Sequence, residues 1–180
     1  AAKKRGLPFG LTEHLAASFT WLAVNKGSDK YGPYAGVPYD GNDPECPFYF
    51  DNKEHYVENP EEYVVAPWYT PNEDFHRYWL DSMKEMIDRF EPDLLYSDGA
   101  LPFHVYYGAE RTDDSNPYAE GLEAVSYLYN KSIEKYGENR AVYNQKERAR
   151  EIYSVGILDI EKSQLSDISS DVWQTDTCIG

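Results

Sequence analysis

The sequence predicts an α/β fold built on a parallel β-sheet. Short apolar segments alternate with two long amphipathic segments, and the connections between them have lengths expected of strand–helix–strand units. Polar side chains recur where the strand candidates end, at residues 13–14, 98, 144–146, 161 and 173–176. This distribution is typical of a (β/α)8 barrel, whose active site lies at the carboxyl ends of its strands. A whole barrel needs about 250 residues, so the 180 residues of this chain predict only part of one.

Composition narrows the class of function. A hydrophobic fraction of 41% predicts a globular protein. The net charge of -15 argues against nucleic acid and anionic membranes as partners and suits a neutral substrate. The aromatic fraction is 16%, with 17 tyrosines. Aromatic rings pack against the C–H faces of sugars, but tyrosine is also common on protein surfaces, so both interpretations stay open.

Several signals are missing from the sequence. No apolar run of about 18 residues predicts a membrane span, no signal peptide is visible, and no glycine-rich phosphate loop follows a strand candidate. The chain begins at Ala1 without a methionine and ends at Gly180 directly after a motif-like run, so we expect an internal piece of a longer protein. Cys46 and Cys178 fit either a pair or two free thiols, and their spacing predicts no zinc site.

The first strand candidate, residues 6–12, leads to Glu13 and His14, although Pro8 weakens it by removing a backbone donor. Glu13, His14 and the nearby Trp21 are candidates for the rim of a sugar pocket. The alternative is an ordinary loop histidine beside a core tryptophan.

Residues 22–69 are polar and dense in turn signals, and we expect an ordered loop excursion over the active face. Asp40, Asp43 and Asp51 within it lack the spacing of a calcium loop, so no metal is predicted there.

The first helix candidate begins at Thr70-Pro71-Asn72-Glu73, a capping box with proline at the first helical position. Its apolar positions recur every three to four residues and predict one buried stripe, formed by Phe75, Trp79, Met83, Ile87 and Phe90. The helix should end before Pro92, and a short apolar strand then ends at Asp98 and Gly99. A carboxylate at the end of a buried strand is costly unless it has a partner or a task.

A loop follows at residues 101–115, in which His104, Tyr106 and Tyr107 either line a pocket or are ordinary loop residues. The second helix candidate opens at Asn116-Pro117 and ends at Gly137. Its expected apolar face consists of Leu122, Val125, Tyr129, Ile133 and Tyr136. Three further strand candidates follow: residues 141–144, ending in polar Asn144, Gln145 and Lys146; residues 156–160, delivering Glu161; and a last one within residues 172–180.

Two of these strand-end acids suit glycoside hydrolysis, which needs a pair of carboxyl groups in different environments. Asp98 and Glu161 should lie on the same side of the sheet. The alternatives are a capping acid at Asp98 and a structural acid at Glu161, since acids at strand ends are frequent in barrel enzymes.

Four segments resemble glycoside hydrolase family 29, the α-L-fucosidases, and occur in the family's order over nearly the whole chain. They are Pro92-Asp93-Leu94-Leu95-Tyr96-Ser97-Asp98-Gly99, which is similar to the nucleophile motif; Gly6-Leu7-Pro8-Phe9-Gly10-Leu11 with the following histidine and Trp21; Tyr143-Asn144-Gln145-Lys146; and Trp173-Gln174-Thr175-Asp176-Thr177-Cys178-Ile179-Gly180. The resemblance implies that residues 1–180 form the central to C-terminal part of a single catalytic barrel domain.

The resemblance also implies a function: a retaining exo-glycosidase that removes terminal α-L-fucosyl residues from glycans, without a cofactor and in a secreted or periplasmic location. Asp98 would be the nucleophile, while substrate contacts would come from Glu13, His14, Trp21, Tyr96, Asn144, Lys146 and Trp173. Gln174 stands where part of the family has its acid/base glutamate, which makes Glu161 the favoured proton donor, ahead of Glu147, Glu151 and Glu13. Lys146 stands where many members have arginine.

Two alternatives stay open at this point. One is a catalytically silent carbohydrate-binding homologue, motivated by Gln174 and by the partial length. The other is a barrel glycosidase for another sugar, such as galactose. The sequence predicts neither the linkage nor the oligomeric state.

Overall fold

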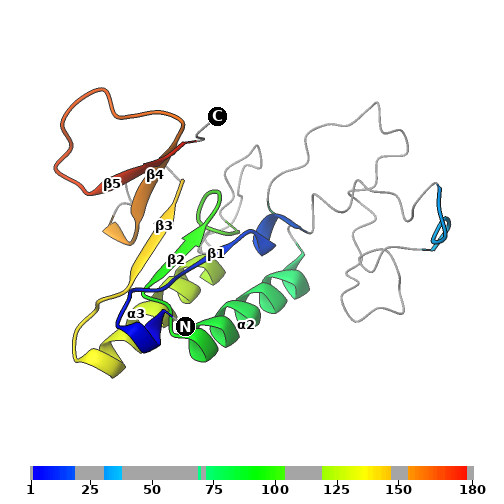
Figure 1. Cartoon of the computed structure of the whole chain (residues 1–180), viewed down its shortest axis with the longest axis horizontal. Coiled ribbons are helices and arrows are strands. Elements are labelled where there is room, and N and C mark those ends of the chain that lie inside the picture. Colours follow the sequence, from blue (N-terminus) through cyan, green and yellow to red (C-terminus); the bar gives the residue numbers. More distant parts are fainter. Residues whose placement is uncertain are drawn as a thin grey trace.

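The computed structural model describes residues 2–18, 31–37, 69, 72–103, 119–146 and 154–177 (Figure 1). The expectations for Trp21, for both cysteines and for the loop residues at 104–107 lie outside these ranges. So do the expected opening of the second helix at residues 116–117 and the alternative proton donors Glu147 and Glu151.

Five parallel strands form one sheet in chain order. They are β1 (Gly10–Glu13), β2 (Leu94–Ser97), β3 (Val142–Gln145), β4 (Ile157–Glu161) and β5 (Trp173–Asp176), preceded by a 3-10 turn, η1 (Lys3–Arg5). The predicted parallel α/β sheet is therefore confirmed. Its first strand begins at Gly10 rather than Gly6, so that Pro8 lies outside the hydrogen-bonded ladder that its missing donor would interrupt.

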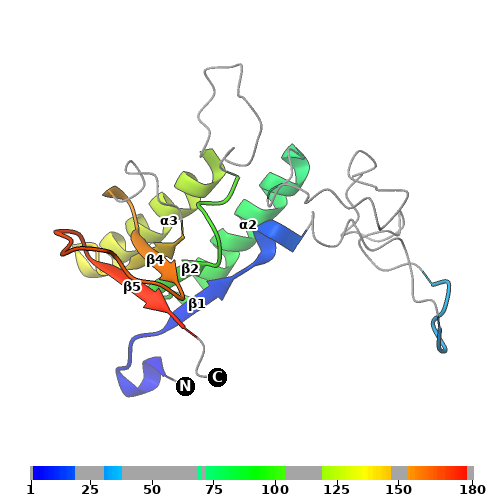
Figure 2. The same cartoon turned by 90° about the horizontal axis from the view of Figure 1, so that it is seen from above.

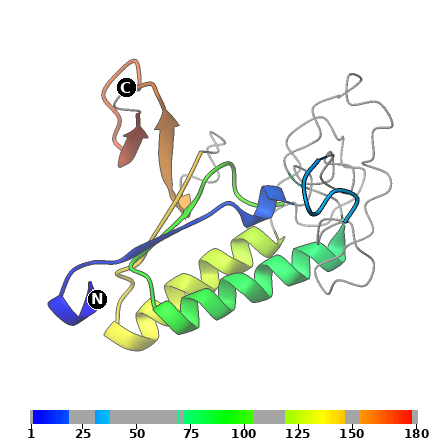
Figure 3. The ribbon, with the colours of Figure 1, turned by 45° about the vertical axis from the view of Figure 1, so that its right-hand side comes forward.

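Helices α2 (Glu73–Phe90) and α3 (Ala119–Tyr136) lie side by side and cover one face of the sheet along β1 to β3 (Figures 1 and 3). Ile87 of α2 and Leu128 of α3 are buried in one apolar cluster with Leu95 of β2 and Tyr143 of β3. Strands β4 and β5 extend away from both helices (Figure 3). Figure 2 shows from above that α2 and α3 lie side by side. The connection between these two strands, residues 162–172, contains no helix. Within the described ranges, no helix is long and apolar enough to cross a membrane.

Helix α2 starts two residues later than the capping box predicts. Its N-cap is Asn72, whose side-chain Oδ1 accepts a hydrogen bond of 2.9 Å from the Phe75 amide. The expected cap at Thr70 is therefore wrong, because asparagine is at least as good an N-cap as threonine and lies nearer the apolar stripe.

The buried stripes differ from the predicted ones at the helix ends. Phe90 is 43% exposed because it is the last residue of α2, where contact with the sheet has ended. On α3, Ile133 and Tyr136 are exposed, and the buried positions are Gly121, Ala124, Val125, Leu128 and Ser132. Small residues allow this face of α3 to pack closely. A Cβ at Gly121 would lie only 2.6 Å from the Pro102 carbonyl oxygen.

The two helix ends behave as expected. Gly137 follows α3 with a positive φ of 77°, and its amide donates to the Ile133 carbonyl. Glu91 ends α2 in the left-handed region, and its amide donates to the Ile87 carbonyl just before Pro92. The chain thus turns sharply at both points and enters β2 and β3 in parallel.

Candidate active site

Polar side chains line the sheet face that points away from the helices. Alternate residues of a strand point to opposite faces, and the parallel register places Tyr96 beside Asn144, Asp159 beside Gln174, and Glu161 beside Asp176. Asp98 and Lys146 come two residues after Tyr96 and Asn144, and so lie on the same face of the sheet. We name these groups the strand-end cluster: His14, Tyr96, Asp98, Asn144, Lys146, Asp159, Glu161, Gln174 and Asp176.

Asp98 lies between a histidine and a lysine from the neighbouring strands. His14 Nε2, just after β1, lies 3.3 Å from Asp98 Oδ2. Lys146 Nζ, just after β3, lies 2.6 Å from Asp98 Oδ1. Burial acts to raise the pKa of Asp98, but the polar and charged groups around it, led by the hydrogen bond and the charge of Lys146, outweigh burial and lower this pKa below the ordinary aspartate value. The carboxyl group is therefore ionised at neutral pH, and it is 39% exposed.

Lys146 holds three carboxyl groups together. Besides Asp98, its ammonium lies 3.2 Å from Glu161 Oε2 and 3.4 Å from Asp176 Oδ2. Burial acts to lower the pKa of Lys146, but its hydrogen bonds, led by the one to Asp98, raise the pKa above the ordinary lysine value. The lysine therefore stays charged and compensates part of the negative charge at this edge of the sheet.

The partly buried Tyr96 pairs with the buried Asp159 next to these charges. The Tyr96 hydroxyl donates a hydrogen bond of 2.6 Å to Asp159 Oδ2 and lies 3.4 Å from Asp98 Oδ1. Burial, followed by the hydrogen bond to Asp159, raises the pKa of Tyr96 well above the ordinary tyrosine value. The phenol therefore keeps its proton at neutral pH.

Gln174 occupies a fixed position on the same face. Its Oε1 accepts a hydrogen bond of 2.6 Å from Asn144 Nδ2. An amide side chain has no proton to transfer in acid/base catalysis. Gln174 therefore orients Asn144 in this structure.

The structure brings most of the sequence-predicted site residues together and separates two of them. Asp98, Glu161, His14, Tyr96, Asn144 and Lys146 belong to the strand-end cluster. Glu13 lies on the helix side, where its Oε2 accepts hydrogen bonds from the Trp79 indole and the Ala16 amide. Trp173 pairs with Leu158, one residue before the pair of Asp159 and Gln174, and so lies on the face opposite the cluster.

Sequence reasoning missed two members of the cluster as individual residues, Asp159 and Asp176. Asp159 is 1% exposed inside β4, and Asp176 stands opposite Glu161 at the end of β5. The alternation Asp159-Ile160-Glu161 was the available signal, since residues two apart on a strand share a face.

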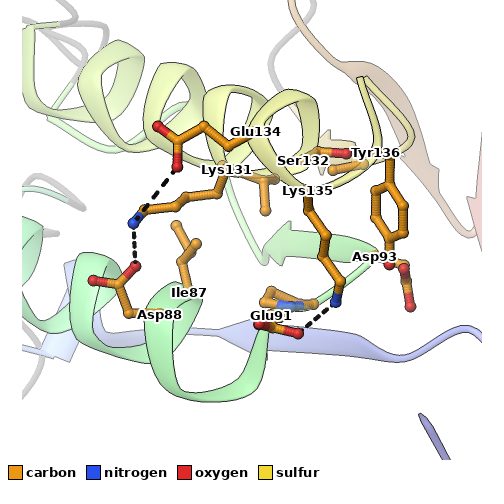
Figure 4. A pocket seen from close by; sticks show the side chains of 12 residues that line it. Ile87, Asp88, Glu91, Asp93, Lys131, Ser132, Glu134, Lys135 and Tyr136 are labelled. Carbon is orange, nitrogen blue, oxygen red and sulfur yellow. Dashed lines mark hydrogen bonds and ion pairs between the residues drawn. The ribbon is translucent and has the colours of Figure 1, made fainter. Parts of the chain in front are cut away.

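A separate cavity of about 390 Å³ lies between the C-terminal parts of α2 and α3 (Figure 4). Its lysines are paired with acids: Lys131 Nζ lies 3.0 Å from Asp88 Oδ1, and Lys135 Nζ lies 2.5 Å from Glu91 Oε2. Asp93, which also lines the cavity, precedes β2. This cavity is therefore at the end of the sheet opposite the strand-end cluster.

Replacing Lys146 with methionine tests the electrostatic balance. We expect the pKa of Asp98 to rise, because burial is then no longer opposed by the ammonium group. In the wild type, the lowered pKa of Asp98 stabilises the folded state at pH values above the ordinary aspartate pKa of 3.8. This stabilisation is lost as the pH falls through the folded-state pKa. The stability difference between wild type and variant should therefore shrink below that pH. Carboxyl ¹³C NMR titration and urea unfolding measure both quantities.

Lys162→Met is the matched control, since it removes the same charge from an exposed residue 3.8 Å from Glu161. This substitution should leave the pKa of Asp98 unchanged. An unchanged pKa of Asp98 in Lys146→Met would contradict this account of the site.

The family model described as Alpha-L-fucosidase matches residues 1–180. A comparison with curated proteins gave no significant match. Since the family model covers the whole sequence, the chain belongs to the α-L-fucosidase family, glycoside hydrolase family 29.

Proposed function

We propose that the strand-end cluster is the active site of a retaining glycosidase that releases terminal α-L-fucosyl residues from glycans. The observation that carries the proposal is the shared contact of two carboxyl groups with Lys146. Asp98 Oδ1 and Glu161 Oε2 lie 2.6 and 3.2 Å from the same nitrogen, so these oxygens are at most about 6 Å apart, compatible with the roughly 5–5.5 Å between the carboxyl groups of retaining enzymes. Membership of the α-L-fucosidase family supports fucosides as the substrate class.

Asp98 is the nucleophile in this proposal. Its carboxylate attacks the anomeric carbon while the bond from that carbon to the leaving oxygen breaks, giving a glycosyl-enzyme ester. The lowered pKa of Asp98 supports this role, because the group is ionised and ready to attack. His14, at 3.3 Å from Oδ2, holds the second oxygen of the same carboxylate.

Glu161 is the acid/base. In the first step it gives its proton to the leaving oxygen, and in the second it takes a proton from the water that cleaves the ester. Its side chain is 53% exposed at the end of β4, beside the partly buried Lys146, and is therefore open to substrate and water. Asp176 is the rival for this role, since it contacts the same lysine nitrogen at 3.4 Å.

We further propose that the sheet is part of a (β/α)8 barrel. Five parallel strands in chain order with helices on one face are the arrangement that such a barrel requires. The cluster would then lie at the carboxyl-terminal rim, where barrel enzymes have their active sites.

The experiment for the nucleophile uses the complete protein that contains this chain. Wild type should release the aryl group from an aryl α-L-fucoside, and Asp98→Gly should lose more than about a thousandfold of that rate, because the ester can no longer form. Azide should restore turnover by occupying the vacated space and should yield the β-fucosyl azide. Turnover that survives in Asp98→Gly would exclude Asp98 as nucleophile. Fucose binding without release by the wild type would favour the silent carbohydrate-binding homologue.

The acid/base assignment is tested by two isosteric variants. Glu161→Gln should lose activity steeply on fucosides with poor leaving groups and retain the first step on dinitrophenyl-type fucosides, which leave without protonation. Asp176→Asn, which alters the same lysine environment, should not discriminate between leaving groups. The reverse pattern would assign the acid/base role to Asp176. Equal losses of Glu161→Gln on both kinds of leaving group would show that Glu161 is not the acid/base.

A further inference from the structure

Asp159 is a buried acid that the mechanism above does not use. It lies inside β4, is 1% exposed, and its Oδ2 accepts a hydrogen bond of 2.6 Å from the Tyr96 hydroxyl. Its Oδ1 has no hydrogen-bond partner among the residues that the structure describes. A carboxyl group in such a place is costly unless it has a partner or a task, and here its partner is Tyr96. Because it is buried, Asp159 cannot touch a sugar, so its task runs through Tyr96.

Tyr96 stands between two carboxyl groups that compete for one proton. A phenol has a single hydrogen to donate. Asp159 Oδ2 is 2.6 Å from the phenol oxygen, while Asp98 Oδ1 is 3.4 Å away. The shorter contact takes the proton, and the phenol oxygen then presents only lone pairs to the surrounding groups. The Lys146 ammonium lies 6.0 Å from the centre of the Tyr96 ring, and its positive charge favours a phenol oxygen that presents lone pairs.

We propose that Asp159 is a positioning residue for the reaction: it holds the Tyr96 hydroxyl proton away from Asp98 and so keeps the attacking carboxylate free of that hydrogen bond. The proposal rests on Asp98 being the nucleophile. A hydrogen bond to a carboxylate stabilises its charged form and weakens it as a nucleophile. Without Asp159, the phenol turns its proton to Asp98. The cost falls on the chemical step and not on sugar binding.

Apart from Tyr96 and Asp159, which the test replaces, the charged and titratable groups around Asp98 are the same in every variant. They are His14 after β1, Lys146 after β3, Glu161 at the end of β4 and Asp176 at the end of β5. Any change in the titration of Asp98 that depends on Tyr96 therefore reports the direction of the phenol proton.

The test is a double-mutant cycle in the complete protein, with kcat, KM and the acid limb of kcat/KM measured on an aryl α-L-fucoside. Asp159→Ala should lower kcat by roughly tenfold or more, leave KM within about twofold, and move the acid limb to lower pH by about one unit, since hydrogen bonds to charged groups are the stronger ones. In the Tyr96→Phe background, the same substitution should change kcat by less than about twofold. It should move the acid limb by no more than about a few tenths of a pH unit.

Equal effects of Asp159→Ala in both backgrounds, or an acid limb that does not move, would overturn the proposal and leave Asp159 a structural acid. If Asp159→Ala fails to fold, Asp159→Asn takes its place. Its amide oxygen still accepts but more weakly than a carboxylate, so a smaller shift of the same sign supports the proposal and an unmoved acid limb overturns it. Failure of azide rescue in Asp98→Gly would instead remove the nucleophile assignment, and the two failures are distinguishable.

Discussion

The contact of one ammonium group with three carboxyl groups is the interaction on which the rest of the site depends. Asp98, Glu161 and Asp176 come from three different strands and meet at Lys146 Nζ. Acids this close repel one another unless a cation lies between them. In a chain with a net charge of -15, that cation is also the local compensation for a general excess of negative charge. The lysine thus makes a paired-carboxylate site possible at this edge of the sheet.

Alternate side chains of each strand point to opposite faces of the sheet, so the apolar core and the strand-end cluster lie on different faces. Residues that point toward α2 and α3, such as Leu95 and Tyr143, form the apolar core, and Glu13 on that side is satisfied by the Trp79 indole. Their neighbours Tyr96 and Asn144 point the other way and belong to the cluster. A shift of one residue in register would exchange the two sets. The helices therefore fix the orientation of the site by burying its opposite face.

Much of this architecture could be predicted from the sequence, because periodicity and strand-end chemistry are local signals. They located α2, β2 and the pair Asp98 and Glu161. The inward face of α3 was predicted only in part: Val125 is buried as expected, but Gly121 and Ala124 were missed because they count little as hydrophobic residues, although their small size allows close packing. The Tyr96 to Asp159 contact was missed because it joins β2 to β4 across an intervening strand, which depends on how the sheet twists.

The central claim is that Asp98 becomes covalently bonded to the sugar during turnover. The most direct measurement is to incubate the complete protein with 2-deoxy-2-fluoro-α-L-fucosyl fluoride, which slows breakdown of the glycosyl-enzyme, and to locate the label by peptide mass spectrometry. The account predicts one fluorofucosyl group per active site, carried by Asp98. A label on Glu161 or Asp176, or hydrolysis with inversion and no labelled peptide, would contradict it.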